Sequence, residues 1–165
     1  MRFTLVDRIT SLEPGKSIEA VKNLSIAEEY LADHFPGFPV MPGVMMLETL
    51  IQAGSWLMRA TENFQFSTIL LKQARALKFN NFVTPGKTLE VSLTVQKWEG
   101  PVCTLKGSGT VENQSAVSAR LTLERFNLRD KNPSLEKSDE FQIQSMKDIF
   151  RQIAPAELQE AVSQS

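Results

Sequence analysis

The sequence predicts an α+β fold in which one long buried helix covers one face of an antiparallel sheet. Residues 43 to about 60 contain no proline and place apolar side chains at three- and four-residue steps, which is typical of a helix. Residues 67 to 126 alternate apolar and polar side chains between short turns, which is typical of antiparallel strands with one covered face. The helix is apolar around so much of its circumference that it should be buried against this sheet.

Length and composition are those of one globular domain with room for an appendage. The chain has 165 residues, and its 18 basic and 19 acidic side chains give a formal charge of -1, so no bulk field favours nucleic acid or an anionic membrane. The single cysteine, Cys103, cannot form an internal disulfide. Asp7 and Arg8 lie where a signal peptide needs an apolar run, and no run reaches the roughly 18 apolar residues of a membrane span. We therefore expect a cytoplasmic protein without membrane insertion.

The first part of the chain predicts a hairpin and a short helical turn. Residues 3–12 and 17–24 alternate loosely on either side of a Pro-Gly turn at 13–16. Ser25 followed by Glu28 is the pattern of a helix N-terminus, so a helical turn should follow the hairpin.

A proline-rich loop comes next and carries His34, the only histidine of the chain. Pro36 and Pro39 bias the residues before them away from helix, which predicts an extended, stiff loop over residues 34–41. Pro42 suits the first turn of the following helix. Such a loop offers little to a core, so it is the first candidate for function.

The long helix contains an ionisable residue, Glu48, in its apolar part. Glu48, Gln52 and Ser55 are spaced by four and three residues and should share one helix face. A carboxylate inside a buried helix must be paired, protonated or functional. His34 and Glu48 are thus one base candidate and one acid candidate.

The remaining chain predicts four strands and a tail. Residues 127–140 are rich in charge and are expected to form a linker, and residues 141–153 have the spacing of an amphipathic helix that docks on the body or on a partner. We expect residues 1–126 to form the domain and 127–165 an extension. The expected strands lie within residues 67–79, 89–95, 102–111 and 117–126.

The segment from His34 to Gly43, His-Phe-Pro-Gly-Phe-Pro-Val-Met-Pro-Gly, followed by Glu48 and Gln52, resembles the (3R)-hydroxyacyl-acyl-carrier-protein dehydratases of the FabZ type. The resemblance covers roughly residues 3 to 126. It implies the hotdog fold, an antiparallel sheet wrapped around one long helix. The pattern of predicted elements independently indicates the same helix and antiparallel sheet, but it does not predict that the sheet wraps around the helix.

The resemblance also implies an active site between two subunits. His34 of one subunit would remove the C2 proton of the acyl thioester, and Glu48 of the other would protonate the departing C3 hydroxyl, which yields a trans-2-enoyl thioester. The Gly43 amide would bind the thioester oxygen, the Val40 carbonyl would orient the imidazole, and Gln52 would support the acid. Acyl carrier protein is the implied partner, the assembly a homodimer or trimer of dimers, and no metal or other cofactor is expected.

Two features differ from the family pattern. Asp33 stands where the family usually has glycine, and Asn80 and Asn81 stand where basic residues are common. A docking patch for an acidic carrier protein would then be weakened or moved, and nearby cations could substitute. These cations are Lys72, Arg75 and Lys78.

Other interpretations stay open at this point. A hotdog thioesterase would use a carboxylate to activate water, and an acyl-binding or assembly subunit would keep the motif without turnover. Gln52 by itself is more often a packing amide than a catalytic one, and Cys103 is most simply a small buried hydrophobe.

Overall fold

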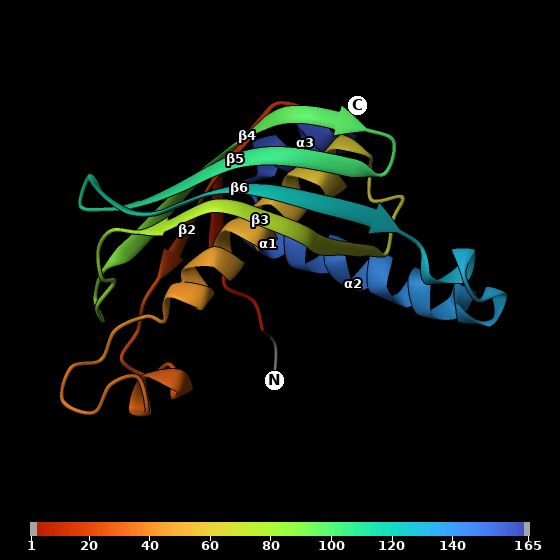
Figure 1. Cartoon of the computed structure of the whole chain (residues 1–165). Coiled ribbons are helices and arrows are strands. Elements are labelled where there is room, and N and C mark those ends of the chain that lie inside the picture. The colour runs from red at the N-terminus through yellow and green to blue at the C-terminus, as the bar shows by residue number, and fades with distance from the viewer. Residues whose placement is uncertain (1–2, 164–165) are drawn as a thin grey trace.

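A computed structural model describes residues 3–163 and consists of one curved antiparallel sheet lying over a central helix, α1 (Gly43–Thr61) (Figure 1). The strand order is β1-β2-β4-β5-β6-β3. The α+β hotdog prediction is confirmed, including the N-terminal hairpin and the boundaries of the long helix. The strands are β1 (Arg8–Glu13), β2 (Ser17–Asn23), β3 (Thr68–Phe79), β4 (Thr88–Glu99), β5 (Val102–Val111) and β6 (Gln114–Phe126).

The apolar face of α1 packs closely against the inner face of the sheet. Leu50 and Leu57 of α1 are fully buried. A Cβ atom at Gly54 would lie 2.8 Å from Leu105 Cδ1, closer than such atoms approach in proteins, and 3.1 Å from Leu123 Cδ1, which is also tight. Glycine at this position therefore allows α1 to pack close to the sheet. This packing sets the position of the opposite helix face relative to the sheet.

The segment between β2 and the histidine loop is held to the sheet by polar contacts. Lys22 of β2 is buried, and its Nζ lies 2.5 Å from Glu28 Oε1. A short 3-10 helix, η1 (Glu29–Ala32), follows. The Ser25 hydroxyl accepts a hydrogen bond from the Ala27 amide at 3.2 Å and does not cap η1, so Ser25 shapes the preceding turn.

Residues 127–140, which were expected to form a linker, contain helical structure. Residues 128–130 and 133–135 form 3-10 helices, and α2 (Glu136–Ile153) begins before the expected start at Phe141. The reason is Asp139, whose side chain is 1% exposed. Its carboxylate accepts hydrogen bonds from the Ser67 hydroxyl and from the backbone amides of Leu128 and Arg129 at 2.9 Å.

The Asp139 contacts make the folded state sensitive to acid. Burial favours the neutral acid, but the three hydrogen bonds and the Arg129 charge outweigh it, so the pKa of Asp139 lies below its usual value. The stabilisation is therefore fully present above the ordinary aspartate pKa of about 3.9 and is lost as the pH falls through the lower pKa of the folded state.

Replacing Asp139 with alanine should lower the free energy of unfolding by about 1–3 kcal/mol at pH 7, because it leaves buried donors without an acceptor. The difference from the wild type should shrink below about pH 4. Urea unfolding of both proteins between pH 3 and 7 measures it. A difference that stays constant over this range would contradict the assigned role of the ionised carboxylate.

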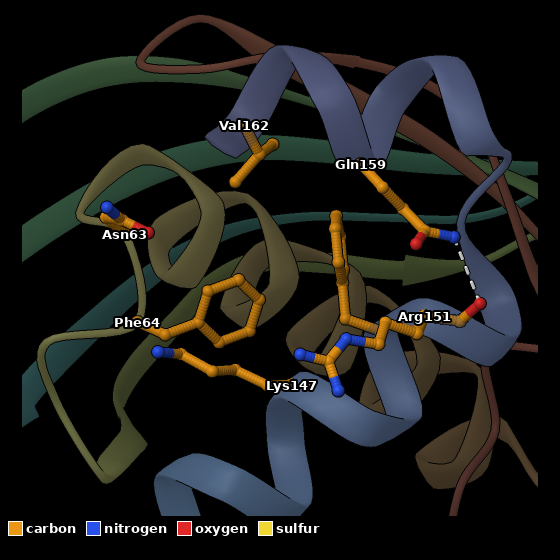
Figure 2. A pocket seen from close by; sticks show the side chains of 7 residues that line it. Asn63, Phe64, Lys147, Arg151, Gln159 and Val162 are labelled. Atoms are coloured by element: carbon orange, nitrogen blue, oxygen red, sulfur yellow. Dashed lines mark hydrogen bonds between the residues drawn. The ribbon is translucent and has the colours of Figure 1, made fainter. Parts of the chain in front are cut away.

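The C-terminal helices dock on the body of the same chain. Of the two alternatives for the tail, docking on the body and docking on a partner, the structure shows the first. Phe150 of α2 is 4% exposed, and its ring lies 6.1 Å from that of Trp56 and 5.3 Å from that of Phe64, measured between centroids. A further helix, α3 (Ala156–Ser163), turns back over the end of α1, where Gln159 Nε2 donates to the Arg151 carbonyl at 3.0 Å (Figure 2). The tail thus extends the hydrophobic core.

Within residues 3–163, none of the helices combines the length and the apolar character that crossing a membrane requires.

Candidate active site

The histidine loop closes on itself through backbone hydrogen bonds. The Val40 amide donates to the His34 carbonyl at 3.0 Å, and Phe35 and Phe38 exchange two hydrogen bonds, at 3.0 and 3.2 Å. Gly37 has a φ of 81°, which a residue with a side chain adopts only with strain. The loop is therefore a tight turn, and the prediction of an extended conformation over the whole stretch is wrong between Phe35 and Phe38.

The contacts of the His34 ring define its tautomer. Nδ1 lies 2.9 Å from the Val40 carbonyl oxygen. A carbonyl oxygen can only accept, so Nδ1 carries the proton and Nε2 of the neutral ring keeps a free lone pair. The ring also stacks on Phe35, with centroids 4.1 Å apart, which restricts its rotation. The loop therefore presents an oriented imidazole whose Nε2, in the neutral form of the ring, can accept a proton.

The N-terminus of α1 follows this loop directly. Pro42 lies at the N-cap position, one residue earlier than predicted, and its carbonyl accepts from the Met45 and Met46 amides at 2.9 and 3.2 Å. Gly43 is the first helical residue, and its amide is one of the donors that a helix N-terminus leaves without an intrahelical partner. A Cβ on Gly43 would lie 3.1 Å from the Phe79 ring, so this ring occupies the space beside the helix start.

Glu48 lies one turn further along α1, half-buried, and is held by Gln52. Gln52 Nε2 donates to Glu48 Oε1 at 3.0 Å and to the Phe3 carbonyl at 3.1 Å, while Gln52 Oε1 accepts from the Leu5 amide at 2.8 Å. Gln52 therefore both orients the carboxyl group and ties the N-terminal segment to the helix. Gln52 thus combines the two roles considered from the sequence, supporting the acid and packing as a structural amide.

A pocket of about 220 Å³ lies along this face of α1. Glu48, Gln52 and Ser55 all line it, which confirms that they share one face. Arg59 continues the same four-and-three spacing and also lines the pocket, although it was not among the site residues predicted from the sequence. The sequence does contain a sign of this role: Arg59 is a charged residue within an apolar helix, on the same helix face as Glu48.

Within residues 3–163, His34 and Glu48 share neither a hydrogen bond nor the pocket that Glu48 lines. The hydrogen bonds of residues 3–163 join His34 to Val40 and Glu48 to Gln52, and none joins the two pairs. His34 does not line the pocket that contains Glu48.

Gln52 can be tested directly. Replacing Gln52 with leucine should lower the free energy of unfolding by about 1–3 kcal/mol, because the Leu5 amide and the Phe3 carbonyl lose their partner. The matched control is Gln144→Leu on α2, which removes only an exposed bond to Asp148 and should change stability by less than about 0.5 kcal/mol. Chemical unfolding of the three proteins measures both, and equal effects of the two substitutions would contradict the bridging role.

A second pocket, of about 180 Å³, lies at the opposite end of α1 and contains none of the predicted site residues (Figure 2). Phe64, Phe150 and Val162 are its buried apolar residues, and Lys147 and Arg151 contribute cations from α2. It lies at the junction of α1, α2 and α3, on the side of the molecule away from the Gly43 end of the helix.

Other residues singled out from the sequence have structural surroundings. Cys103 is fully buried, as predicted, and burial raises the pKa of its thiol to about 12, so the thiolate is absent at neutral pH. Asn80 and Asn81 donate to Ser115 Oγ and Gln114 Oε1 at 2.8 and 3.1 Å. Both asparagines thus fasten the end of β3 to the start of β6.

Comparison with known proteins places this geometry in a family. A family model described as a FabA-like domain matches residues 1–120. The 3-hydroxyacyl-[acyl-carrier-protein] dehydratase FabZ of Lactobacillus helveticus is 41% identical over 117 residues, which are 71% of this chain and 79% of that protein. The FabZ protein of Clostridium kluyveri is 35% identical over 130 residues, or 79% of this chain and 88% of that protein.

The fold also has solved counterparts. The dehydratase heterocomplex ApeI:P from Xenorhabdus doucetiae superimposes with a TM-score of 0.65 at 15% identity, over 81% of this chain and 90% of that one. This likeness concerns the fold alone, whereas the family model and the FabZ proteins match most of the sequence. The chain therefore belongs to the FabA-like family, as a relative of the FabZ-type 3-hydroxyacyl-[acyl-carrier-protein] dehydratases.

Proposed function

We propose that this protein is a hydro-lyase that dehydrates (3R)-hydroxyacyl thioesters on acyl carrier protein in fatty-acid biosynthesis or a related acyl pathway. The observation that carries the proposal is the His34 ring, whose Nδ1–H donates to the Val40 carbonyl at 2.9 Å and so leaves Nε2 free as a base. Family membership supplies the reaction class, because the FabZ relatives are 3-hydroxyacyl-[acyl-carrier-protein] dehydratases.

The reaction begins with proton removal. His34 Nε2 takes the proton from C2, and the electron pair of the broken C–H bond moves toward the thioester carbonyl. The amide at Gly43, with the positive end of the α1 dipole behind it, donates to the carbonyl oxygen as negative charge develops there. Val40 holds the imidazole in the tautomer that this step needs.

The second half of the reaction is loss of water. The electron pair forms the C2=C3 double bond, the C3–O bond breaks, and Glu48 gives its proton to the departing hydroxyl, which leaves as water. The product is a trans-2-enoyl thioester, His34 holds the proton from C2, and Glu48 is left as a carboxylate. Gln52 positions the carboxyl group through its 3.0 Å hydrogen bond. None of these steps calls on a metal or a redox cofactor.

The two catalytic groups come from different subunits in this proposal. His34 and Glu48 have separate surroundings within one chain, and a composite site would bring the loop of one subunit to α1 of the other. The edge strand β3 supports an interface, because an unpaired edge with exposed apolar residues favours pairing with a second copy. The exposed apolar residues of β3 are Leu70, Leu71, Leu77 and Phe79. A dimer or a trimer of dimers fits this arrangement.

Acyl carrier protein is the proposed partner, and the cytoplasm the proposed location. Among the basic residues expected at the docking patch, Lys72 contacts Glu124 at 3.2 Å, whereas Arg75 and Lys78 are exposed on β3. Arg75 and Lys78 are therefore the residues we assign to contact with an acidic carrier. Residues 1–126 form the proposed catalytic unit, and residues 127–165 extend it.

The test is the hydration of a crotonyl thioester, the reverse reaction, followed as loss of the conjugated double bond. The purified wild type should catalyse it without releasing free thiol. A protein that releases free thiol from acyl thioesters but does not hydrate crotonyl thioester would be a thioesterase. One that does neither would be an acyl-binding subunit, and either result would contradict the proposal.

A further inference from the structure

The pocket that begins at Glu48 has a cation at its other end. Arg59 follows Glu48 by about three helical turns, or about 16 Å along the α1 axis. Between them the pocket is lined mainly by apolar side chains from α1, β3 and α2. The apolar lining residues are Phe3, Ile51, Trp56, Ile69, Met146 and Ile149.

Arg59 has fewer partners than its charge requires. Its Nη2 donates to the Ser67 carbonyl at 3.2 Å. Its Nη1 is buried and, among residues 3–163, has no hydrogen-bond partner. No carboxylate of these residues forms an ion pair with it, whereas Arg125 pairs with Glu62. Burial lowers the pKa of Arg59 to about 10, so the guanidinium still carries its charge at neutral pH.

A cation that is largely removed from water and has no anion beside it is costly, and a pocket that leads to it can supply the anion from a ligand. We propose that this pocket receives the far end of the acyl chain and that Arg59 binds a carboxylate there, so the preferred substrates are ω-carboxyacyl thioesters. The inference rests on the proposed dehydratase function, which places the thioester end of the substrate near Glu48.

The dimensions of the pocket limit the chain to medium length. Its volume of about 220 Å³ is small beside the roughly 300–1,000 Å³ of pockets that enclose drug-sized ligands. The rise between Glu48 and Arg59, about 16 Å along the helix axis, sets the scale of the chain that can join the two ends of the pocket. The methylene groups would lie against the apolar lining, to which Met146 contributes a flexible, unbranched side chain, and the carboxylate would bind the Arg59 guanidinium that also lines the pocket.

The tail of the chain contributes to this specificity. Met146 and Ile149 belong to α2, which lies outside residues 1–120 matched by the family model. The preference for a charged chain end is therefore a property of this chain that the shared catalytic motif does not determine.

The test compares two trans-2-enoyl thioesters of equal length that end in a carboxylate or in a methyl group. For the wild type, hydration kcat/KM should favour the carboxylate by about tenfold to a hundredfold, chiefly through KM, which is the effect of one charge-assisted hydrogen-bonded contact. Arg59→Met should abolish this preference. Arg59→Gln should also abolish it, because glutamine keeps a polar side chain at this position but carries no charge.

The matched control is Arg120→Met, which removes an exposed cation from β6 and should leave the ratio unchanged. A wild type that favours the methyl-terminated substrate, or an Arg59→Gln variant that keeps the preference, would overturn the inference. Calorimetric binding of the same two thioesters gives a readout that needs no turnover. If neither thioester is turned over but the carboxylate-terminated one binds more tightly, and this difference depends on Arg59, the dehydratase proposal fails and the assignment of Arg59 stands. If the two thioesters also bind equally well, the assignment of Arg59 fails too.

Discussion

Replacing His34 with alanine is expected to lower kcat for the hydration of a crotonyl thioester by about a hundredfold to ten-thousandfold, the usual contribution of a general base. The physical reason is that no other group of the proposed site can take the C2 proton at neutral pH, since Glu48 must act as the acid. KM should change little, because Nε2 acts on the reacting proton and makes little contact with the rest of the substrate. Steady-state kinetics of the purified variant measure both constants.

His34→Gln is the control for this substitution. Glutamine removes the base but keeps a polar side chain of similar length, whose amide can donate a hydrogen bond within the loop. We expect this variant to be as inactive as His34→Ala but closer to the wild type in thermal unfolding. Substantial activity in either folded variant would show that His34 is not the base.

Replacing Phe150 with alanine is expected to have the largest effect on stability, a loss of about 3–5 kcal/mol in the free energy of unfolding. The ring is buried against Trp56 and Phe64, so its removal leaves a cavity where α2 docks on the end of α1. For a chain of this length each kcal/mol lowers Tm by about 2–4 °C, which predicts a fall of about 6–20 °C. Calorimetry measures it.

Phe141→Ala provides the comparison within the same helix. Phe141 is 75% exposed, so its removal should change the free energy of unfolding by less than about 0.5 kcal/mol. Equal destabilisation by the two substitutions would contradict the packing of α2 on α1. A small effect of Phe150→Ala alone would mean that the tail adds little to the core.

The sequence was sufficient to predict the main elements of the fold because their signals are local. The spacing of apolar residues placed α1 within one residue of its observed end, and alternation identified the strands. The helical structure within residues 127–140 could not be predicted, because it depends on the burial of Asp139 by contacts with Ser67, Leu128 and Arg129, and Ser67 is far away in the sequence. A charged residue in a polar run gives no local sign of such burial.

The candidate site shows the same limit. The tight turn that orients His34 could not be derived from its prolines alone, because it depends on Gly37 and on hydrogen bonds between Phe35 and Phe38. The double role of Gln52 depends on Leu5 and Phe3, which only folding brings to α1. The assignment of His34 and Glu48 as a catalytic pair remains a proposal, and so does the boundary of the catalytic unit at residue 126.

The central claim is that His34 of one subunit works with Glu48 of another, and complementation of two inactive variants tests it most directly. Chains carrying His34→Ala and Glu48→Ala, with different affinity tags, would be co-expressed and the mixed dimer purified through both tags. One of its two sites then has both groups intact, so it should show about half of the wild-type activity, although each homodimer is inactive. A mixed dimer as inactive as the homodimers would contradict the claim and place both groups of each site in a single chain.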